Sequence, residues 1–288
     1  MGIALSIFGL LLVVATYVLS QKWRKGVGHK CLFHLSISLL GSLVLFGVLV
    51  ISHNALRSSA ACTVMGALLH YLLLVTFGWT FVEAVLQYLR FVKVLGTYVP
   101  HFVLKCAVPA WGIPLLVVAT VVSLDPHHYS NRRQLCWPHG QPLLYGFILP
   151  VGLTLGANMV VFSVVIYNIY CRRHKALRSN QSQVELTKAQ LRATILIVFL
   201  LGLTWIFAYL SITDAYGISR VFEYLFVIFS SLQGFVIFLF HVAYEKTARK
   251  LWRSKFVYWL PRGPGEIKGR RLHSDEGSTS TAQKTTST

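Results

Sequence analysis

The side chains that could do chemistry in this sequence are few, and they lie inside long apolar stretches. They are His34, His70, Glu83, Lys105 and, near the end of a stretch, Glu223. Ionisable groups are costly in apolar surroundings, which makes each a candidate for a functional role. The apolar stretches contain no pair of carboxylates and no nucleophile at a spacing that would pair it with a base. We therefore predict no catalytic residues and no enzyme activity.

Metal and cofactor chemistry is equally sparse. Asp125, His127 and His128 lie together between two apolar stretches, and such side chains are common zinc ligands. A solvated loop is the favoured interpretation of this cluster, and we predict no metal site and no cofactor. The last apolar stretch, residues 221–243, contains no lysine, which excludes a retinal Schiff base at that place.

The elements that must position these residues are membrane spans. Of the 288 residues, 55% are hydrophobic and only 12% are charged, against about 25% charged in soluble domains. Seven apolar segments reach the roughly 20 residues that a helix needs to cross a bilayer. They cover residues 2–20, 32–52, 62–89, 102–124, 143–170, 191–212 and 221–243. We predict an all-α membrane protein, with a seven-transmembrane helix bundle over residues 1–243.

The distribution of basic residues predicts the orientation of the bundle. The net charge is +18, and a binding site for nucleic acid would be one explanation. One set of loops, however, carries eleven Lys and Arg residues and the opposite set carries four. Because positive loops stay in the cytoplasm, we predict a multi-pass plasma-membrane protein with its N-terminus outside, its C-terminus cytoplasmic and no nucleic-acid partner.

Residues 244–288 follow the last span and divide into two parts. Residues 244–260 carry four large apolar side chains at near-helical spacing among five basic ones: Leu251, Trp252, Phe256 and Trp259 among Lys246, Arg249, Lys250, Arg253 and Lys255. This pattern predicts a short amphipathic eighth helix that lies on anionic membrane lipids. Residues 261–288 are rich in Gly, Ser and Thr and are predicted to be a disordered cytoplasmic tail, either phosphorylated or passive.

Two of the five cysteines are predicted to form a disulfide. On this topology Cys62 lies at the outer end of the third span and Cys136 in the second outer loop, so these two face an oxidising compartment. Two free thiols are the alternative, which is unusual outside the cell. Cys171 lies beside the inner membrane surface, either palmitoylated or as an unmodified thiol.

His34 and Glu83 are predicted at similar depth near the cytoplasmic boundary. Glu83 follows Cys62 by 21 residues, roughly 31 Å along a helix, and His34 enters the second span from the inner side. A hydrogen bond between the two side chains would satisfy both groups. The alternative is that each reaches separately toward the interface.

Prolines and glycines mark the deformable positions of the spans. Pro109 and Pro114 are expected to bend the fourth span and Pro150 the fifth. Gly202 precedes Trp205 by three residues, and a bulky indole beside a flexible point suits a two-state switch. Close helix packing is the alternative role for these small residues.

From Gly2 to Phe256 the sequence resembles the adhesion family of G-protein-coupled receptors. The resemblance rests on Cys136-Trp137, Trp111-Gly112-Ile113-Pro114, Gly202-Leu203-Thr204-Trp205, Ser231-Leu232-Gln233-Gly234, and the pair His34 and Glu83. It implies a disulfide between Cys62 and Cys136 and a His34–Glu83 pair. Two departures stand out: Leu86-Gln87-Tyr88 replaces the family's His-Leu-Tyr, and the large extracellular region of the family does not precede Gly2.

The resemblance also implies a function. The chain is expected to be a receptor core that transmits an extracellular signal to a heterotrimeric G protein, with a tethered agonist peptide supplied by a missing upstream region. Depth and family match select the ligand-binding residues as Phe77, Trp137, Trp205, Tyr209, Phe222 and Phe226. The polar core and switch are expected at His34, Glu83, Gly202, Trp205 and Gln233. For single aromatics, lipid contact or ordinary packing is the alternative, and a seven-span small-molecule transporter or channel is the alternative function.

Overall fold

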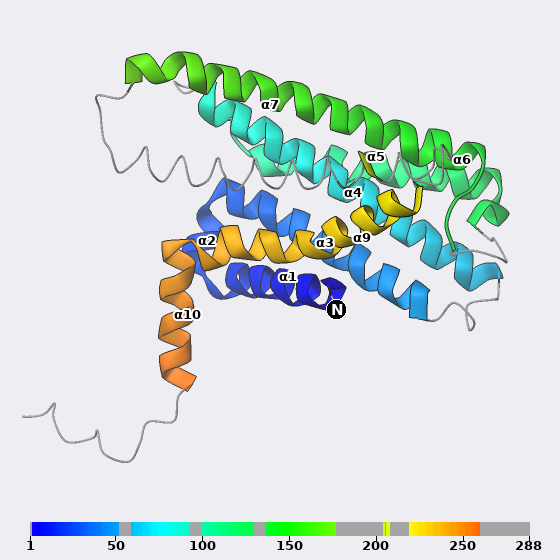
Figure 1. Ribbon diagram of the computed structural model, residues 1–288, viewed down its shortest axis with the longest axis horizontal. Coiled ribbons are helices and arrows are strands. Elements are labelled where there is room, and N and C mark those ends of the chain that lie inside the picture. The colour runs from blue at the N-terminus through cyan, green and yellow to red at the C-terminus, as the bar shows by residue number, and fades with distance from the viewer. Residues whose placement is uncertain are drawn as a thin grey trace, which may run out of the picture. The chain divides into compact units, whose positions relative to one another are not determined.

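The computed structural model describes residues 2–51, 59–92, 99–129, 136–176, 204, 206–207 and 219–259. All regular elements in this part of the chain are helices (Figure 1). An apolar segment in lipid must satisfy its own backbone N–H and C=O groups, and a helix does so within one segment. The predicted all-α fold is therefore confirmed.

The elements lie in the following order along the chain. They are α1 (Gly2–Leu19), α2 (Gln21–Lys25), α3 (Val27–Ile51), α4 (Ser59–Phe91), α5 (Phe102–Leu124), the 3-10 turn η2 (Pro126–Tyr129), α6 (Gln141–Leu143), the π-helical turn η3 (Leu144–Ile148), α7 (Leu149–Ala176), α9 (Ser219–Phe238), the π-helical turn η4 (Leu239–Ala243) and α10 (Lys246–Trp259).

Within the described residues, six helical segments are long and apolar enough to cross a membrane. They correspond to six of the seven predicted spans. The remaining predicted span, 191–212, lies outside the described residues except for Thr204, Ile206 and Phe207. Gly202, Trp205 and Tyr209 therefore also fall outside them.

Several helices extend beyond the predicted apolar segments. α3 begins at Val27 and α7 runs to Ala176, whereas the apolar segments begin at residue 32 and end at residue 170. Hydrophobicity marks only the part of a helix in the hydrocarbon core. The helical backbone continues beyond it because long basic side chains such as Lys30 can reach the polar interface.

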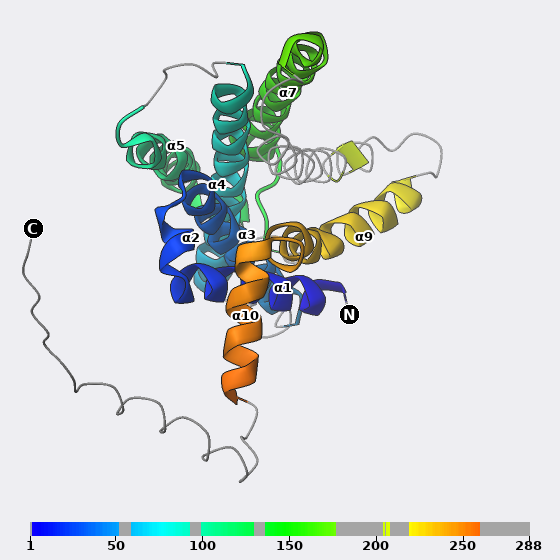
Figure 2. The same cartoon turned by 90° about the vertical axis from the view of Figure 1, so that its left-hand side faces the viewer.

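α4 is the helix against which most of the others pack. It contacts α3, α5, α7 and η2, while α1 contacts α3 and α9. Figure 2 shows these helices nearly end on, with α4 among α3, α5 and α7. Large side chains on the outside, such as Phe8 (59% exposed) and Leu116 (69%), present the apolar surface that lipid covers.

Of the three prolines predicted to bend a span, Pro150 lies beside a change in helix geometry. Pro150 follows η3, where the backbone widens from α to π geometry. A proline has no N–H for the carbonyl four residues earlier, here that of Gly146, and its ring clashes with that carbonyl in a regular helix. Pro109 and Pro114 lie inside α5, which remains one continuous helix over Phe102–Leu124.

Candidate functional site

The end of α4 at Cys62, which the distribution of basic residues predicts to be the outer end, carries the predicted second outer loop; "outer" and "inner" are used below in this predicted sense. Cys62 on α4 and Cys136 in the loop form a disulfide with a Cα–Cα distance of 5.2 Å. The bond joins residues separated by 74 positions, as the topology predicted. Both cysteines are buried, and the bridge holds the loop against the helix.

One face of α4 is shaped to receive this loop. Cys62, Gly66 and His70 recur every four residues and so share a face. A Cβ atom at Gly66 would lie 2.6 Å from the carbonyl oxygen of Cys136, so a larger residue would push the loop away. The Thr63 hydroxyl adds a hydrogen bond of 3.1 Å to the carbonyl of Pro126.

Two of the predicted ligand-binding residues take part in one apolar cluster at the loop. Phe77 is 2% exposed and belongs to an apolar cluster with Phe147 and Val151, against which Trp137 packs. The ring centroids of Trp137 and Phe147 are 4.9 Å apart with the rings nearly perpendicular, a favourable edge-to-face contact. The cluster lies between α4, α5 and α7 in the outer half of these helices.

Other predicted ligand-binding residues lie on α9. Phe222 and Phe226 are half-buried there. Phe207, a described residue between Trp205 and Tyr209 in the sequence, stacks on Phe222 with centroids 6.2 Å apart. The structure thus brings Phe207 of the sixth predicted span to Phe222, while the positions of Trp205 and Tyr209 relative to Phe77 stay predictions.

His34 and Glu83 lie in the inner half of α3 and α4. The His34 ring stacks on Trp79, with centroids 4.4 Å apart and planes 7° from parallel. Glu83 is 8% exposed, consistent with a role inside the bundle. A direct hydrogen bond between His34 and Glu83 is not among the contacts of the described residues, and their pairing stays a prediction.

Gln233 lies on α9 beside a close helix crossing. It is 4% exposed, and its neighbour Gly234 approaches α1 so closely that a Cβ would lie 2.8 Å from the carbonyl oxygen of Ser6. The Ser6 hydroxyl accepts hydrogen bonds from the N–H groups of Gly234 (3.1 Å) and Phe235 (3.3 Å) and donates one to the Ser231 carbonyl.

Ser6 therefore stands between Phe235 and Ser231, two backbone groups that would bond each other in a regular α-helix. Such an insertion into the helical ladder is a recognised cause of helix bending. The role of Ser6 is not predicted from the sequence, where the residue is one of two serines in the first apolar segment.

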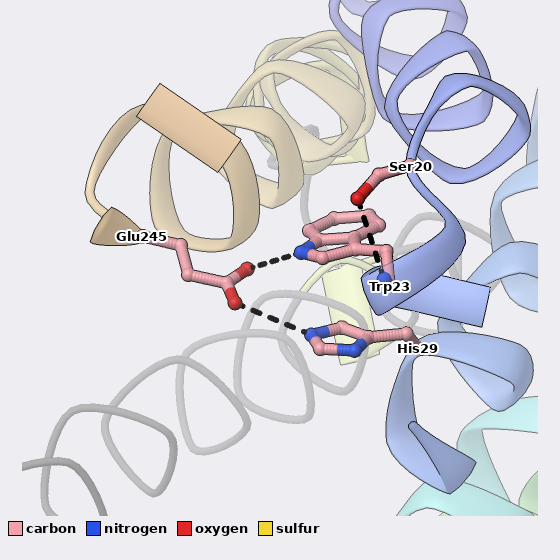
Figure 3. A network of polar contacts seen from close by, with 4 residues as sticks. All are labelled: Ser20, Trp23, His29 and Glu245. Atoms are coloured by element: carbon pink, nitrogen blue, oxygen red, sulfur yellow. Dashed lines mark hydrogen bonds and ion pairs between the residues drawn. The ribbon is translucent and has the colours of Figure 1, made fainter. Parts of the chain in front are cut away.

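A second unpredicted network lies at the inner end, where α2 meets the residue before α10 (Figure 3). The Trp23 indole N–H donates to the Glu245 carboxylate at 2.9 Å, and His29 Nε2 lies 3.5 Å from the other carboxylate oxygen. The Trp23 and His29 rings stack 4.4 Å apart, and Ser20 caps α2 by accepting from the Trp23 backbone N–H. The network joins the first inner loop to the end of the last span.

The three residues with possible metal-binding chemistry do not form a site in the described part of the chain. His128 Nδ1 lies 3.8 Å from the Asp125 carboxylate, and the same carboxylate accepts from the His127 backbone N–H at 2.8 Å. Groups of three or more His, Cys, Asp or Glu side chains able to hold a metal ion are absent from the described residues.

Comparison with known proteins agrees with this arrangement of spans and loop. Residues 1–237 match the family described as "7 transmembrane receptor (Secretin family)". The chain therefore belongs to the secretin family of seven-transmembrane receptors. It is a multi-pass membrane receptor of the G-protein-coupled type and not an enzyme.

Several similar curated proteins are adhesion receptors. Human adhesion G-protein coupled receptor G4 is 34% identical over 88% of this chain, mouse G2 is 34% identical over 88%, and zebrafish G6 is 32% identical over 83%. The chain spans only 8%, 26% and 21% of these relatives. The resemblance to adhesion receptors drawn from the motifs is thus confirmed.

Proposed function

We propose that the chain is the membrane core of a receptor that binds an apolar, partly helical peptide at its outer end and activates a heterotrimeric G protein at its inner end. The observation that carries this proposal is the second outer loop, fixed by the Cys62–Cys136 disulfide above an aromatic cluster that contains Phe77 and Trp137. Aromatic side chains beneath a fixed loop suit an apolar peptide better than a polar solute.

The peptide is proposed to be a tethered agonist from the region that precedes the first span in the whole protein. The relatives extend far beyond the part they share with this chain, which supports such a region. The eleven basic residues of one loop set support an external N-terminus and a cytoplasmic C-terminus.

The signal is proposed to pass by a shift between two packings of the helices. Gly202 and Trp205 supply the deformable point and the bulky side chain of the sixth span, while His34, Glu83 and Gln233 supply polar contacts in the bundle. The hydrogen bonds between the Ser6 hydroxyl and the backbone of α9 support a second deformable point next to Gln233.

The inner end is proposed to meet the G protein through the basic loops. The departure Leu86-Gln87-Tyr88 lies near the inner end of α4, where Leu86 and Gln87 are buried (6% and 5% exposed). α10 is proposed to lie on the anionic inner leaflet, because Lys246, Arg249, Lys250 and Arg253 share one helical face.

A nucleotide-exchange assay tests the proposal. The chain in detergent is mixed with purified heterotrimeric G protein and a panel of synthetic peptides that carry apolar residues at helical spacing. At least one peptide is expected to accelerate nucleotide exchange on the G protein. A chain in vesicles that moves small solutes across the membrane, and that leaves exchange unchanged with every peptide and G-protein subtype, would instead be a transporter or channel.

A further inference from the structure

A buried hydrogen-bonded trio lies directly beneath the second outer loop. His70 on α4 and Tyr129 in η2 are both 0% exposed. His70 Nδ1 lies 2.9 Å from the Tyr129 hydroxyl oxygen, and Nε2 lies 3.0 Å from the carbonyl oxygen of Gly146. Each nitrogen of this imidazole thus contacts a different segment of the chain.

The partners determine where the proton of the neutral imidazole lies. The Gly146 carbonyl can only accept, so Nε2 carries the proton and donates it. Nδ1 is then the acceptor, and the Tyr129 hydroxyl donates to it. Burial raises the pKa of Tyr129, which keeps this hydroxyl protonated and able to donate.

His70 supplies the Gly146 carbonyl with a partner that Pro150 cannot provide. In an α-helix, the N–H of residue 150 would bond the carbonyl of residue 146, but a proline has no N–H to give. A buried carbonyl without a partner would cost free energy comparable to a lost hydrogen bond. His70 offsets this loss from the neighbouring helix.

The ring of His70 also contacts the aromatic residues of the outer cluster. Its centroid lies 5.6 Å from that of Phe147 and 6.0 Å from that of Trp137. His70 therefore contacts the loop at Tyr129 and again at Trp137. It also contacts the first turn of the fifth span.

We propose that His70 is a positioning residue of the outer site. Through Tyr129 and Gly146 it fixes the second outer loop and the turn η3 relative to α4, and so sets the place of Trp137 against which the peptide binds. The part that concerns peptide binding rests on the proposed function, whereas the part that concerns the loop does not.

Amide hydrogen exchange of the chain in detergent tests the loop. His70→Phe keeps a ring but removes both hydrogen bonds, and Tyr129→Phe removes a single hydroxyl. His70→Gln keeps an amide NH2 group that can donate and an oxygen that can accept. Tyr71→Phe is the matched control, because its hydroxyl bonds the Trp111 carbonyl of α5 at 3.3 Å and not the outer loop.

Both His70→Phe and Tyr129→Phe are expected to accelerate exchange of the amides of residues 127–129 by roughly 3- to 10-fold, the effect of one lost hydrogen bond. His70→Gln is expected to stay within about twofold of the parent chain, and Tyr71→Phe to leave these amides unchanged. Unchanged exchange in both Phe variants, or equally fast exchange in His70→Gln and His70→Phe, would overturn the proposal.

Direct binding of a fluorescently labelled peptide, the tightest binder of the panel above, tests the consequence for the site. His70→Phe is expected to weaken binding by roughly 3- to 10-fold and His70→Gln to restore it. Equal binding to all variants alongside faster loop exchange would refute the role at the site. If no peptide of the panel binds the parent chain, the proposed function fails, and the exchange rates still decide whether His70 holds the loop.

Discussion

At the scale of single residues, the polar side chains of this receptor core differ in what surrounds them. His70 has a hydrogen-bond partner at each ring nitrogen, whereas His34 is held by ring contacts with Trp79 and Trp111. Glu83 is almost fully buried at the inner end of α4. A buried charged or polar group lowers the stability of the fold unless it is paired. Whether His34 and Glu83 pair with each other can therefore be measured through stability.

We expect His34 and Glu83 to depend on each other energetically. Replacing either by alanine should perturb the resting state, and thermal unfolding of the two single variants and the double variant should give a coupling of about 0.5 to 3 kcal/mol. Trp79→Phe provides a further comparison, because it keeps an aromatic face against His34. Additive effects of the two alanine substitutions would mean that the two side chains do not interact.

We expect Trp205→Ala to abolish peptide-driven nucleotide exchange while leaving surface expression and the disulfide intact. The reason is depth: Trp205 follows Leu191 by 14 residues, roughly 21 Å from the inner face, and Gly202 weakens the helix nearby by about 1 kcal/mol relative to alanine. Phe8→Ala is the matched control, because this aromatic is 59% exposed on the outside of α1. Trp23 would be a poor control, since it is 1% exposed and bonded to Glu245. Normal signalling by Trp205→Ala would refute the switch but not the receptor family.

At the scale of elements, contacts between helices distant in sequence hold the first and last described spans together. α1 and α9 cross at Gly9 and Gly234, where the Ser6 hydroxyl accepts hydrogen bonds from the backbone of α9. Small residues allow such close approaches in membranes, where helix association depends on packing and on hydrogen bonds between helices.

Gly234→Ala is expected to destabilise the bundle by about 1 to 3 kcal/mol, because the new methyl group would meet the Ser6 carbonyl and the Leu10 side chain at less than 3.0 Å. Gly47→Ala is the matched control: this glycine on α3 has no atom within 4 Å of the added Cβ. Thermal unfolding in detergent compares the two. Equal stability of both variants would show that the α1–α9 crossing tolerates a larger separation.

The network of Trp23, His29 and Glu245 predicts differences in stability between variants that keep and variants that lose its hydrogen bond. Trp23→Phe keeps the ring that stacks on His29 but removes the N–H that bonds Glu245, and should cost about 1 kcal/mol of stability. Glu245→Gln keeps an acceptor oxygen for Trp23 and should be milder than Glu245→Ala. Thermal unfolding of the three variants measures these differences, and a Glu245→Ala variant as stable as Glu245→Gln would exclude a contribution from the hydrogen bond that Trp23 donates to this side chain.

At the scale of the whole molecule, the orientation in the membrane decides which end meets the peptide and which the G protein. The positive-inside rule places Asn180-Gln181-Ser182, a formal glycosylation sequon, in the third inner loop. Because glycosylation occurs on the luminal side, we expect Asn180 to stay unmodified in cells. Glycosidase treatment followed by mass analysis of the parent chain and of Asn180→Gln checks this. A glycosidase-sensitive shift that disappears in Asn180→Gln would reverse the topology.

The sequence by itself determined the helical class, the approximate spans and the cysteine pair. Each of these depends on local composition: apolar runs of sufficient length, basic residues between them, and two cysteines on one side of the membrane. The resemblance to adhesion receptors also lay in short contiguous motifs. Helix ends were less accurate, as at Val27, because hydrophobicity marks the membrane core and not the end of the backbone hydrogen bonding.

The tertiary structure alone decided which polar groups meet. His70 and Tyr129 are 59 positions apart, Trp23 and Glu245 are 222 apart, and Ser6 and Gly234 are 228 apart. No periodicity joins such residues, since the two partners of each contact lie in segments far apart in the sequence. Their contacts depend on the relative rotation and depth of whole helices, which packing between the spans determines and local sequence does not.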